Sequence, residues 1–299
     1  MLDLRRLRLL RELARRGTIA AVAEALSYSP SAVSQQLATL EKEAGVRLLE
    51  PAGRRVRLTA QADLLVTHTE ILLEEMERAE AALARSLHET VGTLRVAAFQ
   101  TAVLSLVPNA LSPLTRQHPT LRVEVTELDP ELALPALIAG EFDLILGEEY
   151  PGFPLSRPRE TERLDLLTDE LRLTTPAGWS ERSLPSLASR PFVMEPVGTT
   201  AWEWATAACR QAGFEPDVRY TSTDLQIHLR LVESGLAAAL LPDLSGADDR
   251  HHVTAHRLSG RPSRQIFTTV RRGAAGHPNI QAFTTALKAH EPRPDPELA

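Results

Sequence analysis

The sequence is poor in several features that define whole classes of protein. It has one cysteine, Cys209, among 299 residues, so no disulfide can form within the chain and no zinc site can use two cysteines. No stretch approaches the roughly 18 consecutive apolar residues of a membrane-spanning helix. Because 43% of the residues are nevertheless hydrophobic, we expect a globular protein of about two domains, each with its own core.

The amino-terminal segment lacks the apolar core of a secretory signal peptide. Arginines interrupt the leucines throughout residues 4–11, which makes the segment too polar for such a core. Together with the single cysteine, this predicts a cytoplasmic protein that does not act at a membrane. Cys209 lies among alanines, and we expect a small buried hydrophobic residue there rather than a redox switch.

Sequence motifs of common enzymes are also missing. There is no glycine-rich phosphate loop, dinucleotide fingerprint, His-Glu-x-x-His zinc pair or Gly-x-Ser-x-Gly nucleophile elbow. His251, His252 and His256 lie close in sequence, but adjacent histidines usually diverge and no cysteine or carboxylate completes a recognisable ligand set. We therefore expect no metal, no cofactor and no catalytic residue.

Charge is distributed unevenly along the chain. The formal net charge is −6, which alone would argue against a nucleic-acid partner. Residues 1–58, however, hold eleven basic and six acidic side chains, a local charge of +5 that leaves −11 for the rest. A basic amino-terminal part on an acidic body predicts that a polyanion binds the amino-terminal part alone.

Three short helices are predicted at the start of the chain. The first two are rich in leucine and alanine, and Gly17 separates them. The third begins at Ser29, a favourable N-cap, with Pro30 in the first helical position, and it ends near Gly45.

A two-stranded hairpin is predicted next, from residues 46–49 and 55–58 with Gly53 in the turn. Helices in this order followed by a β-wing predict a winged helix-turn-helix domain over residues 1–58. Small polar side chains on the third helix can approach base edges, and arginines of the wing can contact the DNA backbone. The predicted DNA contacts are Ser29, Pro30, Ser31, Ser34, Gln35, Arg54, Arg55 and Arg57.

A long helix without glycine or proline is predicted for residues 59–90. Small or apolar residues recur there at heptad spacing in two interleaved sets: Leu65, Leu72, Ala79 and Ser86, with Thr69, Met76 and Leu83 between them. This pattern predicts a linker and dimerisation helix. The alternative is a solvated helix that packs on its own chain. A dimer would present two recognition helices to a palindromic DNA site.

The remaining chain alternates strand-like and helix-like segments, which is typical of an α/β domain with a parallel sheet. Strands are predicted near residues 93–98, 121–127, 142–146, 218–221, 236–241 and 265–270. The tail, residues 291–299, holds three prolines and is expected to be disordered.

The chain resembles the LysR-type transcriptional regulators over almost its entire length. In the amino-terminal part, the family's order and spacing are matched at residues 21–26, 29–34, 40–41, 45–48 and 56–59. Farther along, similarity to the effector domain of that family is found at Pro108, His118-Pro119 and residues 140–144, 232–236 and 241–242.

Three positions depart from the family's pattern. Leu49 stands where phenylalanine is usual, and Ala62 stands where a glycine is expected. Pro51 replaces an expected arginine, which removes one DNA contact that Arg54 or Arg55 can supply instead.

The resemblance implies a two-lobed effector domain, similar to a periplasmic solute-binding protein, over residues 91–290. Lobe I would comprise about 91–164 and 267–290, and lobe II about 165–266, with crossing strands near 164–167 and 264–267. The implied partners are double-stranded DNA with a palindromic operator, a small-molecule effector, a second copy or a tetramer of this chain, and RNA polymerase as a further candidate.

Ligands of open α/β sheets gather at the carboxyl ends of the strands. Gln100, Thr101 and Ala102 follow a predicted strand and open a helix, whose free amides can bind an anionic or carbonyl group. Members of the family commonly bind ligand at the position of Thr101, although this residue could equally serve only as a helix cap.

Two further segments are predicted to face the same cleft. Gly198, Thr199 and Thr200 follow a strand and precede a helix in the second lobe. Glu148 and Glu149 follow a strand of the first lobe. A carboxylate directed inward predicts a ligand with an amine or several hydroxyls, whereas the alternative is a pair of solvated loop residues.

Three classes of function fit these features: a ligand-responsive regulator, an enzyme or transport component with a solute-binding fold, and a structural DNA-binding protein. The winged helix favours the first class. Sequence-specific footprinting, turnover of a bound metabolite and equal affinity for random duplexes distinguish the three.

Overall fold

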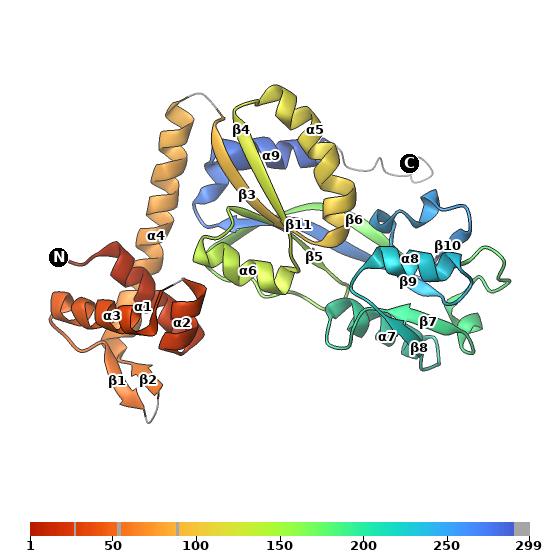
Figure 1. Cartoon of the computed structure of the whole chain (residues 1–299), viewed down its shortest axis with the longest axis horizontal. Helices are drawn as coiled ribbons and strands as arrows, with labels where there is room; N and C mark the ends of the chain where they lie inside the picture. Colours follow the sequence, from red (N-terminus) through yellow and green to blue (C-terminus); the bar gives the residue numbers. More distant parts are fainter. Residues whose placement is uncertain (27, 53–54, 88–89, 290–299) are drawn as a thin grey trace.

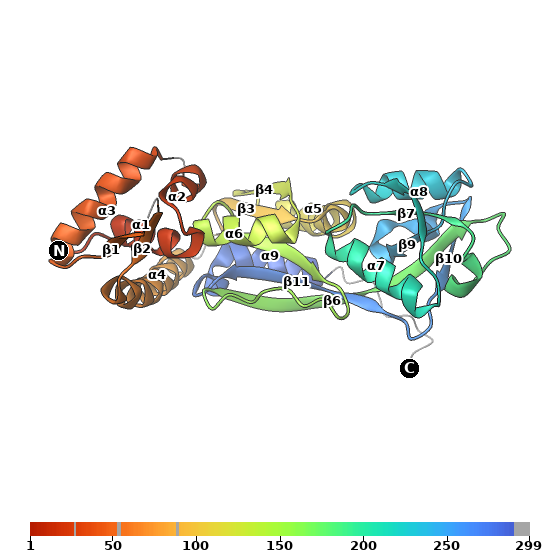
Figure 2. The same cartoon turned by 90° about the horizontal axis from the view of Figure 1, so that it is seen from below.

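The computed structural model describes residues 1–26, 28–52, 55–87 and 90–289. The molecule is elongated, with the amino-terminal helices at one end, a helix-covered sheet in the middle and a second α/β lobe at the other end (Figures 1 and 2). In this described part of the chain, every helix is too short or too polar to span a lipid bilayer. The predicted disorder of residues 291–299 concerns a segment outside the described residues.

Three helices form the amino-terminal bundle, as predicted: α1 (Leu4–Arg16), α2 (Ile19–Ala25) and α3 (Pro30–Ala44). Gly17 ends α1 in the left-handed conformation, with φ of +72°, which glycine adopts without the steric penalty of a Cβ. The Ser29 hydroxyl accepts a hydrogen bond from the amide of Ala32 at 3.2 Å, so Ser29 is the predicted N-cap of α3. Leucines of α1 and α3 meet Val22 and Ala23 of α2 in one buried core.

The wing consists of β1 (Leu49–Ala52) paired antiparallel with β2 (Arg55–Leu58). The first strand therefore starts three residues later than the predicted residues 46–49. The reason is a carboxylate of α3: Glu41 accepts hydrogen bonds from the amides of Leu48 and Leu49 at 2.8 and 3.1 Å. The predicted turn at Gly53 lies outside the described residues.

A single long helix, α4 (Ala60–Ser86), connects the bundle to the body and is capped by Thr59. Its first part packs on the bundle, where Ala62 is fully buried. Several large apolar side chains of α4 are instead exposed: Leu64, Ile71, Leu72, Met76 and Leu83. The residues at heptad spacing therefore differ in burial: Thr69 is buried within the chain, whereas Leu72, Met76 and Leu83 are exposed.

The first lobe is built on three parallel strands in the order β5-β3-β4. They are β3 (Gly92–Ala98), β4 (Leu121–Glu127) and β5 (Leu144–Glu149). The helical elements of this lobe are η1 (Ala102–Leu106), α5 (Val107–Gln117), α6 (Pro130–Ala139), η5 (Ala274–Gly276) and α9 (Pro278–Lys288). Residues of α9 share a core with β3 and α5, so the carboxyl-terminal helix packs on the first lobe, as expected.

Two long strands, β6 (Thr161–Pro176) and β11 (Ser263–Arg271), run side by side and continue into the second lobe. The sheet is therefore mixed, which corrects the expectation of a parallel sheet. Strand β11 pairs antiparallel with both β5 and β6, because two crossing connections must run in opposite directions. Strand β6 pairs with β11 up to Glu170 and with strands of the second lobe from Leu171, a few residues after the expected crossing.

The strands that lie within the second lobe are β7 (Pro191–Met194), β8 (Asp217–Thr221), β9 (Ala239–Pro242) and β10 (Val253–Arg257). Its helical elements are η2 (Leu184–Leu187), α7 (Thr200–Gln211), α8 (Leu225–Glu233), η3 (Asp243–Ser245) and η4 (Ala247–Asp249). Cys209 on α7 is fully buried in the core of this lobe, which confirms the expected hydrophobic role. Burial raises the pKa of its thiol to about 12, so the thiol stays protonated near neutral pH.

Candidate functional site

The recognition helix α3 separates an apolar face from a polar face. Val33, Leu37 and Leu40 are buried in the bundle core. Ser34 and Gln35 are exposed on the other side, and no hydrogen bond within the described residues involves their side chains. Small exposed side chains on a helix fixed by its buried face are suited to contact a DNA groove. Ser29, Pro30 and Ser31 are exposed at the start of the same helix.

The wing provides part of the predicted basic surface. Arg57 is 74% exposed and pairs across the hairpin with Glu50 at 2.9 Å. Such an exposed pair contributes little stability, so the guanidinium can exchange Glu50 for a phosphate with little loss. Arg54 lies outside the described residues, and for Arg55 only the backbone in β2 is described.

Three arginines of α1 do not add to this DNA surface. Arg8 donates a hydrogen bond to the carbonyl oxygen of Ala139, and Arg11 donates to the carbonyl oxygen of Ile138 at 3.1 Å. Arg15 forms an ion pair with Glu160 at 3.1 Å. These three side chains bind the first lobe, so the local charge of +5 overstates what is available to DNA.

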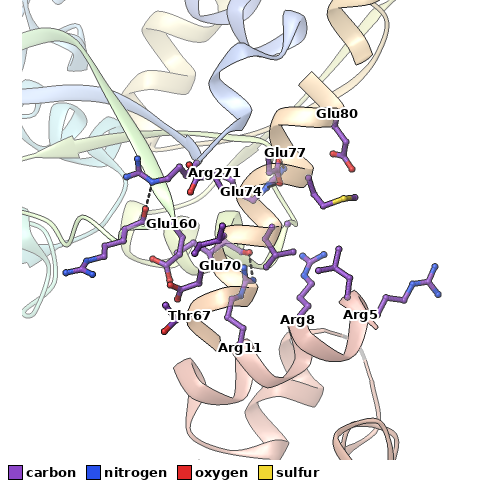
Figure 3. Close-up of a pocket in the computed structure, with 18 of the residues that line it drawn as sticks. Arg5, Arg8, Arg11, Thr67, Glu70, Glu74, Glu77, Glu80, Glu160 and Arg271 are labelled. Atoms are coloured by element: carbon purple, nitrogen blue, oxygen red, sulfur yellow. Dashed lines mark hydrogen bonds and ion pairs between the residues drawn. The ribbon is translucent and has the colours of Figure 1, made fainter. Parts of the chain in front are cut away.

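A cavity of about 850 Å³ lies at this junction between α1, α4 and the first lobe. Figure 3 shows Arg8 and Arg11 extending from α1 toward α4, which carries Glu70 and Glu77. Burial, followed by the nearby charge of Glu160, raises the pKa of Glu70. The junction is therefore rich in charged side chains around a cavity, and no sequence pattern predicted it.

The helix that receives these arginines is α6. It has no basic residue in its own last turn, so the partial negative charge of its final carbonyls is met by Arg8 and Arg11 from the amino-terminal bundle. Arg271 of β11 donates to the carbonyl oxygen of Leu137 at 3.2 Å and pairs with Glu77 of α4. Three arginines from two other parts of the chain thus cap one helix.

The opposite end of α6 borders a second cavity, of about 240 Å³, between the two lobes. We call this cavity the interlobe cleft. Its lining residues are Phe99, Gln100, Thr101, Asp129, Pro130, Glu131, Leu132, Glu148, Tyr150, Glu195, Gly198, Thr199, Thr200, Ala201, Thr223, Leu225 and Arg264. The ends of β3, β5 and β7 and the first turns of α6 and α7 meet here.

Six of the seven predicted effector residues are brought together in the interlobe cleft: Gln100, Thr101, Glu148, Gly198, Thr199 and Thr200. Ala102 is fully buried at the start of η1 and does not line the cavity. Glu148 and Glu149 take separate roles, because successive side chains of a strand point to opposite faces. Glu148 lines the cavity, whereas Glu149 pairs with Arg163 at 2.7 Å.

A buried arginine organises the floor of the cleft. Arg264 is 1% exposed and donates two hydrogen bonds to one carboxylate oxygen of Asp169, at 2.9 and 2.7 Å. It also donates to Thr101 Oγ1 at 2.7 Å and pairs with Glu148. Burial opposes the charge, but Glu148, Tyr150 and Asp169 together raise the pKa of Arg264, so the guanidinium stays protonated.

Three hydrogen bonds bridge the two lobes at the interlobe cleft. The side-chain amide of Gln100 donates to Asp224 at 2.8 Å and accepts from the amide of Leu225 at 2.8 Å. On the other side, the Thr200 hydroxyl donates to Glu131 at 3.1 Å. These contacts link the first lobe directly to the second.

Carboxylates dominate the charge of the cleft. Burial, together with the neighbouring charge of Glu148, raises the pKa of Glu195 to about 7. Burial also raises the pKa of Glu148, although Arg264 opposes this shift. The pKa of Asp129 is raised by burial and by Glu131. The cleft therefore concentrates negative charge at a place where ionisation is unfavourable.

The residues missed by sequence reasoning fall into two groups. Asp129, Glu131 and Glu195 each follow a strand, so the rule used for the other cleft residues could have found them. Arg264 and its partner Asp169 lie within the two crossing strands and have no such signal. Among the described residues, no group of three histidine, cysteine or acidic side chains is placed to hold a metal.

Two family models cover nearly the whole chain. The model "Bacterial regulatory helix-turn-helix protein, lysR family" matches residues 4–63, and the model "LysR substrate binding domain" matches residues 88–292. The first match contains the recognition helix and the wing. The second contains both lobes and the interlobe cleft.

Individual relatives agree with these matches. A probable HTH-type transcriptional regulator, LrrA of Synechococcus elongatus, is 28% identical and covers 97% of this chain and 98% of its own length. A probable hydrogen peroxide-inducible genes activator of Mycobacterium leprae is 28% identical over 76% of this chain and 73% of its own.

Among solved structures, a full-length OxyR variant from Pseudomonas aeruginosa shares the fold. Its TM-score is 0.62 at 20% identity, with 96% of this chain and 95% of that chain covered. The order of helices, wing, linker helix and two lobes is thus that of a known family. The chain belongs to the LysR-type transcriptional regulators, which are DNA-binding proteins controlled through an effector domain and not enzymes.

Proposed function

We propose that this regulator reads a palindromic operator in the cytoplasm through α3 and the wing, and that an effector in the interlobe cleft controls its output. The observation that carries this proposal is the position of α6 (Pro130–Ala139). Its first turn lines the cleft, and its last carbonyls receive Arg8 and Arg11 from the DNA-binding part.

The DNA contacts come from exposed residues near the amino terminus. Ser34 and Gln35 approach base edges from α3, and Ser29, Pro30 and Ser31 lie at its start, where backbone amides favour a phosphate. Arg57 contacts the DNA backbone from the wing, with Arg54 and Arg55 as further wing contacts. The support is the exposure of the described residues on elements whose other faces are buried.

A dimer forms through α4. Leu72, Met76 and Leu83 recur on this helix at the spacing of a helix–helix seam, and all three are exposed in the single chain. A contiguous apolar stripe of this kind is seldom left in water by a monomeric protein. Two chains joined along α4 bring two recognition helices to a two-fold symmetric operator.

The route from effector to DNA runs along α6. A helix of ten residues is about 15 Å long, so α6 reaches from the cleft to the junction with α1. Because Glu131 in its first turn bonds Thr200 of the opposite lobe, any change in lobe closure displaces α6. Its other end then carries Arg8 and Arg11, and with them α1, to a new position. An effector must bind one lobe arrangement more tightly than the other for this to occur.

The name of the mycobacterial relative raises peroxide sensing as a second candidate. The geometry here does not favour it. Cys209 is the single cysteine, is fully buried, and has a pKa raised to about 12 by burial. Oxidation requires an accessible thiolate, so we assign control to the interlobe cleft.

The test begins with selection of operators from random duplexes by the full-length protein, followed by gel shifts on selected and scrambled sites. Gln35→Ala should reduce discrimination between the two about tenfold, since a lost base contact is worth about 1–3 kcal/mol. Gln117→Ala, an exposed glutamine at the end of α5, is the matched control. If wild type binds all duplexes equally, the function is structural and the proposal is wrong.

A further inference from the structure

The interlobe cleft has the chemistry of a site for a positively charged ligand. Four carboxylates line it, from three separate segments of the chain: Asp129 and Glu131 at the start of α6, Glu148 on β5, and Glu195 after β7. Arg264 is the single basic residue of the lining set, which contains no lysine and no histidine. An anionic ligand would meet this excess of negative charge in a partly buried cavity, where Coulomb repulsion is weakly screened.

Arg264 is not available to offset the carboxylates. Its guanidinium already donates to Asp169, which is itself 3% exposed, and it pairs with Glu148. Removing one of these partnerships to bind a ligand anion would leave a buried carboxylate unpaired. The arginine therefore supports the floor of the cavity rather than recognising an anion.

Two buried hydroxyls point to a second feature of the ligand. Tyr150 and Thr101 line the cleft at 6% and 1% exposure, and both accept a hydrogen bond from Arg264, at 3.5 and 2.7 Å. Within the described residues, neither hydroxyl donates a hydrogen bond in return. A buried donor without an acceptor is unfavourable. An oxygen atom of the ligand could accept the hydrogen bond that each of these hydroxyls is able to donate.

The helix amino termini at the cleft do not reverse this preference for a cation. Thr199 already caps α7, accepting a hydrogen bond from the amide of Trp202 at 3.2 Å. Asp129 and Glu131 bring two carboxylates to the first turn of α6. Carboxylates at the start of α6 and the Thr199 hydroxyl at the start of α7 therefore occupy the positions at which these helices would attract an anion.

We propose that the effector is a small organic cation, a protonated amine that also carries an oxygen acceptor. The proposal rests on the proposed function, because it assigns the ligand class of the same cleft. The amine is stabilised by the carboxylates of both lobes, and the oxygen accepts from Tyr150 or Thr101. A cavity of about 240 Å³ is below the range of roughly 300–1,000 Å³ that holds drug-sized ligands, so the ligand is a small metabolite.

Binding of a cation would also reduce the free-energy cost of ionising Glu195. The charged and titratable groups that share the cleft with Glu195 are Glu148 on β5 and Tyr150 just after it, Asp129 and Glu131 at α6, and Arg264 on β11. An acid whose pKa is raised in the folded state destabilises that state once it ionises. This penalty is absent below the ordinary pKa of about 4.5 and complete above about 7, and a bound cation would reduce it.

The test uses the full-length protein and four probes with the same four-carbon chain: 4-amino-1-butanol, 1,4-diaminobutane, 1,4-butanediol and succinate. Calorimetry at pH 8 should show binding of the amino alcohol at least tenfold tighter than that of the diol, and none of succinate. Binding should weaken as the pH falls below about 7, where Glu195 becomes protonated.

Two variants locate the binding and supply a readout without any ligand. Glu195→Gln should weaken the binding of the amino alcohol at least tenfold. It should also raise the melting temperature of the protein at pH 8 but not at pH 5. Glu203→Gln, an exposed glutamate on α7 outside the cleft, should do neither. If Glu195→Gln lowers the melting temperature at pH 8, Glu195 is favourably paired and the proposal is overturned.

The remaining outcomes separate the ligand class from the function. Binding of succinate or the diol in place of the amines, or binding of no probe at all, overturns the cation assignment. Binding of amines with no change in operator affinity or in the DNA footprint keeps the cation assignment and overturns effector control of DNA binding.

Discussion

The polar side chains of the recognition helix and those of the interlobe cleft are in opposite states. On α3, Ser34 and Gln35 are exposed and unpaired within the described residues, whereas in the cleft Arg264 is 1% exposed and bonded to Asp169, Glu148 and Thr101. The DNA face can therefore change without disturbing the fold. The cleft is part of the fold, so its binding residues also determine stability.

Replacement of Arg264 should produce the largest effect. Arg264→Met removes a fully buried cation that pairs with both Asp169 and Glu148, which should destabilise the effector domain by about 3–5 kcal/mol. All three tryptophans, Trp179, Trp202 and Trp204, lie in the second lobe and pack in its core. Urea unfolding followed by their fluorescence measures the change directly.

The control for this experiment is an exposed arginine of the same lobe. Arg210 pairs with Glu215 at 2.7 Å, with both side chains at least 60% exposed. Arg210→Ala should change the free energy of unfolding by less than about 1 kcal/mol. Equal effects of the two substitutions would remove the contrast between a structural cleft and an exposed surface.

A smaller effect is expected at the junction between α1, α4 and the first lobe, which joins the DNA-binding part to the effector domain. Arg11 is 5% exposed, pairs with Glu12 at 2.6 Å and donates to the carbonyl oxygen of Ile138. Arg11→Ala should cost about 1–3 kcal/mol of local stability, because the last turn of α6 loses one of its three arginine donors and Glu12 loses a partner. Hydrogen–deuterium exchange of residues 137–141 should accelerate accordingly.

Arg5 provides the comparison at the same junction. It lines the same cavity but is exposed, so Arg5→Ala should leave exchange in α6 unchanged. Unaltered exchange in Arg11→Ala would show that the amino-terminal bundle does not hold α6, and the proposed route between cleft and DNA would then fail.

The smallest effect is expected at the wing. Arg57→Ala should leave stability unchanged within about 0.5 kcal/mol, because its pair with Glu50 is exposed. It should weaken operator binding a few-fold and reduce the slope of log affinity against log salt by about one. Arg122→Ala is the control, because it removes an equally exposed arginine from the first lobe, where Arg122 is 75% exposed and pairs with Glu124. An unchanged salt slope in Arg57→Ala would exclude a phosphate contact.

Local pattern alone predicted the amino-terminal bundle. The cap at Ser29, the proline at position 30 and the glycines at 17 and 45 each act on neighbouring backbone atoms, and the structure shows these helix ends. The later start of β1 depended instead on Glu41, seven residues away from Leu48. Even this small shift required a tertiary contact.

The cleft was predictable only in part. Side chains that follow strands, such as Thr101, Glu148 and Thr199, were found because strand ends meet at one edge of a sheet. Asp129 and Glu195 satisfy the same rule and were overlooked. Arg264 could not be found this way, because its partners Thr101 and Asp169 are 163 and 95 residues away in sequence.

The sequence by itself determined the winged helix, the linker helix and the family, because these depend on helix caps, apolar spacing and motif order within short segments. The tertiary structure decided where the charge acts. It turned Arg8, Arg11 and Arg15 away from DNA and onto the first lobe, and it gathered four carboxylates around one neutralised arginine. Coulomb interactions and desolvation depend on distance and burial in space, and neither is contained in the order of residues alone.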